Sequence, residues 1–435
     1  MNQIAEELNS TLSCCTAGRL LSDFGRRMYF PKGIIAQSAE AKKLAKEANA
    51  TIGMAFHNGK PMILSALSDN LPHLTEAETV AYAPTAGIEN VRGLWQELLL
   101  EKNPSLSKET ISLPVVVPGI TAGISYIADL FFEKGTPLVS AFPCWDNYSL
   151  IFEERREAVL RAVRFLGENG LDIDAITCAI ESEAKHGAVR IILNFPNNPS
   201  GYSPTQKEAD SICNCLKSVA EQGADVLVIC DDAYYGLIYE ENVSRESIFC
   251  RLSGLHERIL AVKADGPTKE DYVWGLRIAL ITFGSKGMTG VQFDALISKL
   301  MGAIRSSVSC SNTPAQFLLL KAFAGKKTAE EKSQYREILR RRYQAVKNFV
   351  KSNTGHKVLR ALPFNSGYFM SFECSTISAE ELRQFLLANH GIGTIALEGR
   401  YLRIAFSALN EEQIPHVLET IFKAAETLYK NHKAV

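Results

Sequence analysis

Lys269 lies in a short turn, and Arg277 follows it eight residues later, just before the apolar run 278–283. A lysine amine can form an imine with an aldehyde, and an arginine can bind a phosphate group through its planar fork. Most loop lysines are simply solvated side chains, so the spacing alone decides nothing. The prediction of a site depends on the polar groups upstream.

Two upstream segments share one order, an apolar strand followed by a polar loop. The run 189–193 leads into a loop that contains Asn198, and the run 226–230 leads into Asp231 and Tyr234. An amine, a cation, an amide, a carboxylate and a phenol are the groups needed to hold a phosphorylated pyridine aldehyde. The sequence therefore predicts a site for pyridoxal 5'-phosphate, with Lys269 as the imine-forming residue.

Apolar strands alternate with helical stretches through the middle of the chain. One such stretch, 204–222, has apolar residues at helical spacing between the two strands just described. This alternation is typical of an α/β fold with a mostly parallel sheet sandwiched by helices. Ligands of such sheets gather beyond the carboxyl ends of the strands, where Asn198, Asp231 and Lys269 fall.

We predict three segments. Residues 1–48 form the N-terminal part of a small domain, and 49–320 form a large domain that binds the cofactor. Residues 321–435 contain a linking helix, indicated by an apolar stripe within 331–350, and then the C-terminal small domain of α+β texture.

Composition excludes several classes of protein. The chain has 435 residues, 46% hydrophobic and 22% charged, with a formal net charge of -1, so neither a nucleic-acid partner nor a membrane surface is expected. No apolar run approaches the roughly 20 residues needed to span a bilayer, and the N-terminus does not resemble a secretory signal. The ten cysteines lack zinc-ligand spacing, so we expect reduced thiols, no metal site and a cytoplasmic protein.

Each predicted role competes with a structural one. Asp231 would stabilise the protonated ring nitrogen, although a turn or helix-capping acid is common at such a position. Asp232 would point to the other face by strand alternation. Asn198 and Tyr234 would donate to the phenolic oxygen of the ring, and the loop around Asn198 is otherwise a tight turn. Trp145 would stack on the ring, unless it is a core residue.

The two anionic groups of the bound molecules need their own partners. Gly119, Ile120 and Thr121 stand between a strand and a helix, where backbone N–H groups can bind the phosphate together with Arg277. Arg403, in an otherwise apolar strand, would bind the carboxylate of an amino acid; its structural alternative is an ion pair with a helix acid.

From about residue 80 to 410, the pattern resembles the aspartate aminotransferase family, the fold type I, class I/II pyridoxal-phosphate enzymes. The resemblance implies a homodimer with shared sites, in which Tyr82 reaches the phosphate of the neighbouring subunit. It also implies that Asn147 supports the ring aspartate and that Asn198 and Trp145 contact substrate. The full set that it assigns is Tyr82, Gly119, Ile120, Thr121, Trp145, Asn147, Asn198, Asp231, Tyr234, Thr268, Lys269, Arg277 and Arg403.

The chain departs from the family pattern at two places. The family usually has Ser-x-Ser-Lys, and here Gly266 stands where the first serine binds phosphate, whereas Thr268 replaces the second. Counting back four residues from Ser311 reaches Ser307 and not Arg305, so no arginine is assigned to read a substrate side chain.

The predicted function is an aminotransferase that moves an amino group between an L-amino acid and a 2-oxo acid. The catalytic residues would be Lys269, Asp231 and Tyr234. Other reactions on the same fold remain open, namely those of a β-lyase, a decarboxylase or a cyclising synthase. A non-catalytic regulator that senses pyridoxal phosphate is a further alternative. The near-neutral charge and the lack of an N-terminal DNA-binding extension disfavour it.

Overall fold

The computed structural model describes residues 2–12, 21, 23–27, 33–324 and 326–434. Its centre is a seven-stranded sheet in the order β4-β10-β9-β8-β7-β5-β6. Only β10 runs antiparallel to its neighbours in this sheet. This architecture confirms the predicted α/β fold with a mostly parallel sheet. The strands are β4 (Val115–Val117), β5 (Pro137–Ala141), β6 (Val159–Val163), β7 (Ala188–Asn194), β8 (Asp225–Asp231), β9 (Ile259–Asp265) and β10 (Ala279–Gly284).

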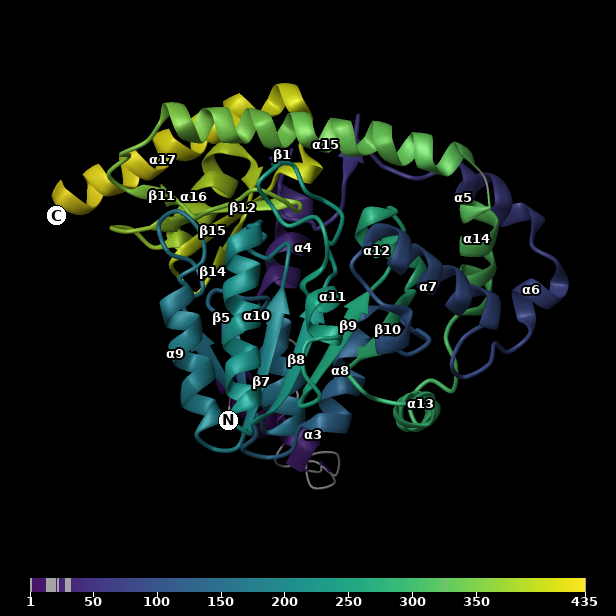
Figure 1. The fold of residues 1–435 in the computed structure, drawn as a ribbon. Helices are drawn as coiled ribbons and strands as arrows, with labels where there is room; N and C mark the ends of the chain where they lie inside the picture. Colours follow the sequence, from purple (N-terminus) through teal and green to yellow (C-terminus); the bar gives the residue numbers. More distant parts are fainter. Residues whose placement is uncertain (1, 13–20, 22, 28–32, 325, 435) are drawn as a thin grey trace.

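Helices cover both faces of this sheet, which is why its central strands are apolar on both sides (Figure 1). Alternate residues of a strand enter different cores: Val228 packs in one and Ile229 in the other. One face is covered by α7 (Glu89–Lys102), α9 (Ile173–Ala184), α10 (Gln206–Glu221), α11 (Ile248–Ser253) and α14 (Thr313–Phe323). The other is covered by α8 (Ile120–Phe131), the π-helical segment Ser149–Glu154 and α13 (Gly290–Arg305).

The C-terminal part forms a second, smaller α+β unit. Its sheet has the order β11-β12-β15-β14, and its own apolar core includes Phe372, Ile404 and Leu418. The long helix α15 (Lys326–Ser352) runs from the large domain across to this unit (Figure 1). The elements are β11 (Leu359–Ala361), β12 (Phe369–Cys374), α16 (Ala379–His390), β13 (Ile392–Gly393), β14 (Ile395–Leu397), β15 (Tyr401–Ala405) and α17 (Ile414–Ala434).

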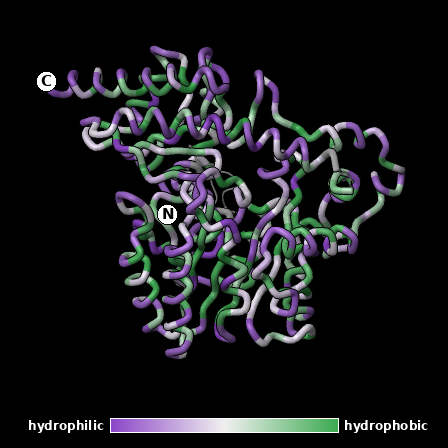
Figure 2. The backbone as a smooth tube through the Cα atoms, turned by 45° about the horizontal axis from the view of Figure 1, so that its top comes forward, coloured by the Kyte–Doolittle hydropathy of each residue, from purple (hydrophilic) through white to green (hydrophobic). Residues whose placement is uncertain are grey.

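Hydrophobic segments gather inside both units, and hydrophilic ones line the outer helices (Figure 2). Four short elements join the N-terminal part to the large domain: β2 (Phe56–His57), β3 (Lys60–Pro61), α5 (Ser65–Asn70) and α6 (Glu76–Val80). Met62, Leu64 and Leu67 pack there against Tyr234 and Tyr368, and so bring this region next to the sheet edge where ligands are expected.

The N-terminal part contacts both domains, whereas the sequence analysis assigned all of 1–48 to the small one. Helix α4 (Ile34–Leu44) packs on β13, β14 and α16, and β1 (Ala48–Asn49) pairs with β13. In contrast, Arg27 of α3 (Asp23–Arg27) donates to the Glu154 carbonyl at 3.0 Å, in the large domain. Helix α1 (Gln3–Leu12) packs on α3. Residues 1, 13–20, 22 and 28–32 of this segment lie outside the described residues.

Among the described residues, no helix is long and apolar enough to cross a membrane. No group of histidine, cysteine and acidic side chains in these residues is arranged to hold a metal ion. The cysteines that the structure describes are all free thiols, and Cys14 and Cys15 lie outside the described part.

Candidate active site

A cavity of about 150 Å³ opens beyond the carboxyl ends of β7, β8 and β9. Nine residues singled out from the sequence line it together. They are Ile120, Thr121, Trp145, Asn198, Asp231, Tyr234, Thr268, Lys269 and Arg277, and Asn194 and Ala233 complete the lining. Segments that lie up to about 150 residues apart in the chain therefore meet at one edge of the sheet, as expected for an α/β fold.

Lys269 lies in the short helix α12 (Pro267–Glu270), directly after β9. Its amine donates to the Gly53 carbonyl at 2.8 Å and lies 5.1 Å from the centre of the Tyr234 ring. The Tyr368 hydroxyl donates to the backbone carbonyl of Lys269 at 2.7 Å and so fixes the turn. Burial, followed by the positive charges of Arg403 and Arg277, lowers the pKa of the amine to about 7. A neutral amine, the form that attacks an aldehyde, is thus available near neutral pH.

Asp231 ends β8 and is buried. The Tyr148 hydroxyl donates to one carboxylate oxygen, and the Ala233 backbone N–H donates to the other at 3.2 Å. Burial raises the pKa of Asp231 to about 6, although the hydrogen bond from Tyr148 opposes that rise. An anionic Asp231 therefore gains from a cationic partner in the cavity, such as a protonated pyridine nitrogen.

The structure shows a contact to Asp231 from the neighbour of Asn147, the residue to which the resemblance assigns this support. The side chain in contact with the carboxylate is that of Tyr148, and Asn147 is not among the cavity-lining residues. The two residues are neighbours in a helical turn, so their side chains point in directions about 100° apart.

Arg403 lies in β15 of the small domain and is almost completely buried. Its guanidinium donates to Asn198 Oδ1 and to the Thr51 carbonyl, both at 2.9 Å, and lies 4.3 Å from the Phe369 ring centre. Its Nε is buried without a hydrogen-bond partner among the described residues. No carboxylate pairs with it there, and burial lowers the pKa of Arg403 to about 10. An incoming carboxylate would satisfy both the charge and the open donor.

The opposite end of the cavity is suited to a phosphate group. Gly119 caps the N-terminus of α8 with a φ of 95°, and a Cβ there would lie 2.5 Å from Arg277 Nη2. The glycine therefore lets the guanidinium approach the free N–H groups at the helix start. Thr121 and Thr268 also line this cavity. Amides, hydroxyls and a cation form a donor set that fits a phosphate.

Gly266 departs from the family serine for a steric reason. A Cβ at this position would lie 2.8 Å from Ala279 Cα on the adjacent strand β10. A serine would therefore fit here only with a shift of the backbone, and Thr268 is the hydroxyl residue of this turn that lines the cavity.

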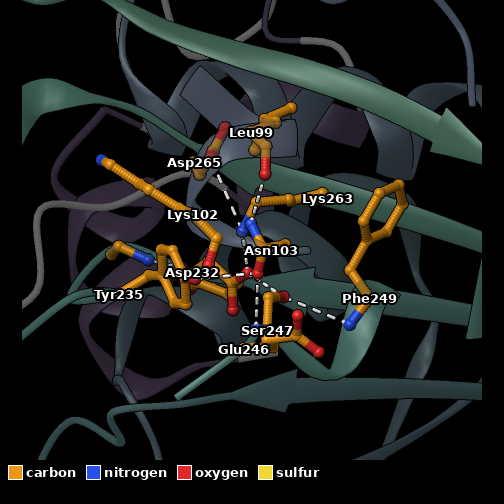
Figure 3. Close-up of polar contacts among 12 residues, drawn as sticks. Leu99, Lys102, Asn103, Asp232, Tyr235, Glu246, Ser247, Phe249, Lys263 and Asp265 are labelled. Carbon is orange, nitrogen blue, oxygen red and sulfur yellow. Dashed lines mark hydrogen bonds and ion pairs between the residues drawn. The ribbon is translucent and has the colours of Figure 1, made fainter. Parts of the chain in front are cut away.

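Of the other residues named from the sequence, Gly119, Asn147 and Arg403 are not among the cavity-lining residues, and Asp232, Tyr82 and Arg305 lie away from the cavity. Asp232 points to the other face of the sheet, where it pairs with the buried Lys263 and accepts from Ser247 at 2.6 Å (Figure 3). Tyr82 is 91% exposed, and Arg305 is exposed at the end of α13, bonded to Ser309. The cavity of one chain thus contains neither Tyr82 nor a side-chain-reading arginine.

Comparison with known proteins gives the family. The model of the aminotransferase class I and II family matches residues 54–421. The chain belongs to this family. An aspartate aminotransferase of Sulfolobus acidocaldarius is 22% identical over 223 residues, which are 48% of this chain and 53% of that protein. The match thus spans about half the length of the curated relative.

Solved structures of similar fold cover nearly the whole chain. An aminotransferase from Anaerococcus prevotii has a TM-score of 0.82 at 23% identity, over 92% of this chain and 98% of that one. The aspartate aminotransferase of Thermus thermophilus with maleate has a TM-score of 0.74 at 20% identity, over 93% and 99%. At these identities the likeness shows the fold, and the chemistry depends on the residues of the site.

Several residues of the candidate site in this chain were not predicted from the sequence. Asn194 donates to the Asp231 carbonyl at 2.9 Å and accepts from the Asn198 backbone at 2.8 Å, and so ties β7 to β8. Its place at the end of an apolar strand could have identified it. Gly53 and Thr51 lie in a segment more than 200 residues away from Lys269 in the sequence, and no local sequence pattern indicates that they belong to the site.

Proposed function

We propose that this family member is a pyridoxal-phosphate-dependent aminotransferase that moves an amino group between an L-amino acid and a 2-oxo acid. The observation that carries the proposal is the amine of Lys269. It is buried among three groups that a cofactor and an amino acid require: Asp231 at one end of the cavity, Arg277 at the other, and Arg403 from the small domain.

Bound pyridoxal phosphate would supply an aldehyde and a protonated ring that accepts electrons. Arg277, with the start of α8, Thr121 and Thr268, would bind its phosphate. Asp231, oriented by Tyr148, would bind the ring N–H, and Trp145 would lie against the ring. Asn198 and Tyr234 would donate to the phenolic oxygen.

Arg403 would bind the α-carboxylate of the amino acid. This would orient the substrate so that its Cα–H bond is perpendicular to the ring. Once the substrate has taken its place on the cofactor, the released Lys269 amine would move a proton between Cα and the carbon that carried the aldehyde. A pKa near 7 suits this role, because the amine both accepts and donates a proton at neutral pH.

We also propose that the active unit is a homodimer with shared sites. Tyr82 supports it, because its side chain is 91% exposed while the preceding Ala81 carbonyl is held by Thr313 at 2.7 Å. Val80 is 81% exposed beside it. A fixed backbone that carries two exposed apolar side chains is typical of a contact between copies. The free thiols of the described cysteines favour a reducing compartment and hence the cytoplasm.

The half-reaction tests the proposal. The protein loaded with pyridoxal phosphate is mixed with a panel of L-amino acids in the absence of any 2-oxo acid. An aminotransferase converts its cofactor stoichiometrically to the amine form and releases one 2-oxo acid per site. A later addition of a 2-oxo acid restores the absorbance of the aldehyde form. Release of ammonia or carbon dioxide without conversion of the cofactor would assign a lyase or a decarboxylase instead.

A further inference from the structure

A second buried ionic cluster lies on the face of the sheet opposite the candidate active site. Figure 3 shows its residues. Lys263 is fully buried and pairs with Asp232, and its amine is 3.5 Å from an oxygen of Asp265. The three side chains are at most 4% exposed. Ion pairs that are so fully removed from water often stabilise a protein no better than apolar residues do, so the cluster calls for an explanation beyond stability.

The cluster is rigidly held. Asp265 accepts from the Trp95 indole at 3.0 Å, and Asp232 accepts from Ser247, the residue that caps α11. The ammonium of Lys263 lies 4.4 Å from the centre of the Tyr235 ring. These contacts join β8 and β9 to α7 and α11 and leave the carboxylate of Asp232 no freedom to turn toward the active-site face.

The chain connects the cluster to the active site in two places, at the end of β8 and through β9 into the Lys269 turn. Asp232 directly follows Asp231, and the two carboxylates point to opposite faces. The Asp232 backbone N–H also donates to the Ala264 carbonyl of β9 at 3.0 Å. Lys263 and Asp265 lie on β9, which leads through Gly266 into the turn of Lys269. The end of β8 thus carries two adjacent carboxylates, and only Asp232 forms an ion pair with a lysine among the described residues.

We propose that Lys263 is a positioning residue for Asp231: its ammonium neutralises Asp232 across the sheet, so that the negative charge at the end of β8 that remains available to a bound ligand is that of Asp231. The inference rests on the proposed function, in which Asp231 meets a protonated ring. Without Lys263, two neighbouring buried carboxylates would compete for ionisation, because like charges at close range disfavour each other.

The ionisable groups around both carboxylates agree with this assignment. Burial opposes a charge on Lys263, but the attraction of Asp232 and Asp265 outweighs it and raises the pKa of the amine. Asp232 in turn contributes to the raised pKa of Asp231. The ionisable groups that act on Asp231 are Tyr148, Tyr234, Lys269 and Asp232, and those around the cluster are Tyr235, Cys230, Cys250, Lys102 and Glu270.

Two single substitutions with opposite expected effects test the proposal. In Lys263→Met the cation is lost, so the pH at which Asp231 becomes protonated should rise by roughly one unit, as expected for a charge pair separated by a few ångströms of protein. In Asp232→Asn the neighbouring charge is lost while Lys263 keeps Asp265, so this pH should fall. The double variant should return close to wild type. General damage to the fold would not give shifts of opposite sign.

Two readouts follow the titration. In the full-length apoprotein, ¹³C NMR of labelled aspartate, assigned with Asp231→Asn, reports the carboxyl of Asp231 directly. In the loaded protein, equilibrium dialysis measures the dissociation constant of pyridoxal phosphate between pH 5 and 9. The ionisations of the cofactor and of Lys269 are common to all variants and cancel in the comparison.

Lys332→Met is the matched control, because Lys332 pairs with the buried Asp271 next to the Lys269 turn, and neither Asp231 nor Asp232 is among its ion-pair partners in the described residues. It should lower the melting temperature without moving the titration of Asp231.

An unchanged midpoint in a folded Lys263→Met protein would overturn the inference, since the loss of the cation would then leave Asp231 unaffected. If that variant does not fold, Asp232→Asn decides, and an unchanged or higher midpoint is the contrary result. The NMR arm decides the inference even if wild-type protein binds no pyridoxal phosphate, an outcome that would instead defeat the proposed function.

Discussion

Lys263 and Lys269 lie six residues apart in one continuous segment, and their surroundings shift the pKa values of their amines in opposite directions. Lys263, at the centre of β9, is locked between two carboxylates that keep it charged. Lys269, in the turn after the strand, is buried near two arginines, and its pKa falls to about 7. Six residues of β9 and the turn after it therefore separate an ammonium held between carboxylates from an amine that loses its proton near neutral pH.

This difference predicts which lysine carries the cofactor. Borohydride reduction of the protein loaded with pyridoxal phosphate should label Lys269 alone, because the Lys263 amine is charged and faces away from the cavity. Peptide mapping by mass spectrometry locates the label. Lys269→Ala should abolish labelling at low cofactor excess, and a label on Lys263 in either protein would refute the assignment.

The pH dependence of cofactor attachment follows from the same pKa. The rate at which the apoprotein attaches pyridoxal phosphate should rise between pH 6 and 8 as the Lys269 amine loses its proton, and should level off above pH 8. An ordinary lysine, with a pKa near 10.4, would give a rate that is still rising at pH 9. Stopped-flow absorbance measures the rate, and a continued tenfold rise per pH unit up to pH 9 would contradict the lowered pKa.

Arg403→Lys should impair the use of amino acids while sparing the cofactor. Lysine keeps the charge but loses the fork that bonds a carboxylate at two points, and one hydrogen bond to a charged group contributes about 1.5–3 kcal/mol. We expect kcat/KM to fall roughly ten- to hundredfold, with an unchanged dissociation constant for pyridoxal phosphate. Arg400→Lys, at an arginine with a 57% exposed side chain three residues away, is the control. Equal effects of both substitutions would move the carboxylate site elsewhere.

The sequence could predict the parts of the site that depend on local pattern. Apolar strands with polar ends place Asn198, Asp231 and Lys269 at one edge of a parallel sheet, and alternation along β8 sends Asp232 to the opposite face. These inferences need only the alternation of side chains along a strand and the location of ligands beyond the carboxyl ends of parallel strands.

The remaining parts depend on tertiary contacts. Gly53 meets the Lys269 amine from a segment 216 residues away, and nothing in its own neighbourhood marks it as special. The resemblance assigns the support of Asp231 to Asn147, and no local pattern marks the neighbouring Tyr148 as the residue that donates to the carboxylate. The cation for Asp232 comes from β9, and nothing in the sequence around Lys263 indicates that its partner lies at the end of β8.

Gly266→Ser, which restores the residue usual in the family, should destabilise this protein. The new Cβ would lie 2.8 Å from Ala279 Cα, and the displacement of packed backbone typically costs about 1–3 kcal/mol. Gly302→Ser is the matched control, since a Cβ at that exposed helical position meets nothing within 4 Å. Urea unfolding of both variants measures the difference. A stable Gly266→Ser protein with tighter phosphate binding would show that β10 shifts easily. Steric conflict would then not explain why glycine stands at this position in place of the family's serine.

Subunit exchange tests whether Tyr82 acts in the site of a second copy. Lys269→Ala and Tyr82→Phe proteins, each impaired by itself, are mixed and allowed to exchange subunits. In the mixed dimer, one site combines a native Lys269 from one chain with a native Tyr82 from its partner, so activity should recover to about a quarter of the wild-type value per chain if exchange is random. The other site carries both substitutions and stays inactive. Mixing Lys269→Ala with Asp231→Asn is the control, because both residues line the same cavity of one chain, so each chain of the mixed dimer keeps one substituted residue in its own cavity. This mixture therefore contains no intact cavity and should show no recovery. Recovery in neither mixture, together with a monomeric mass for active protein, would defeat the shared site.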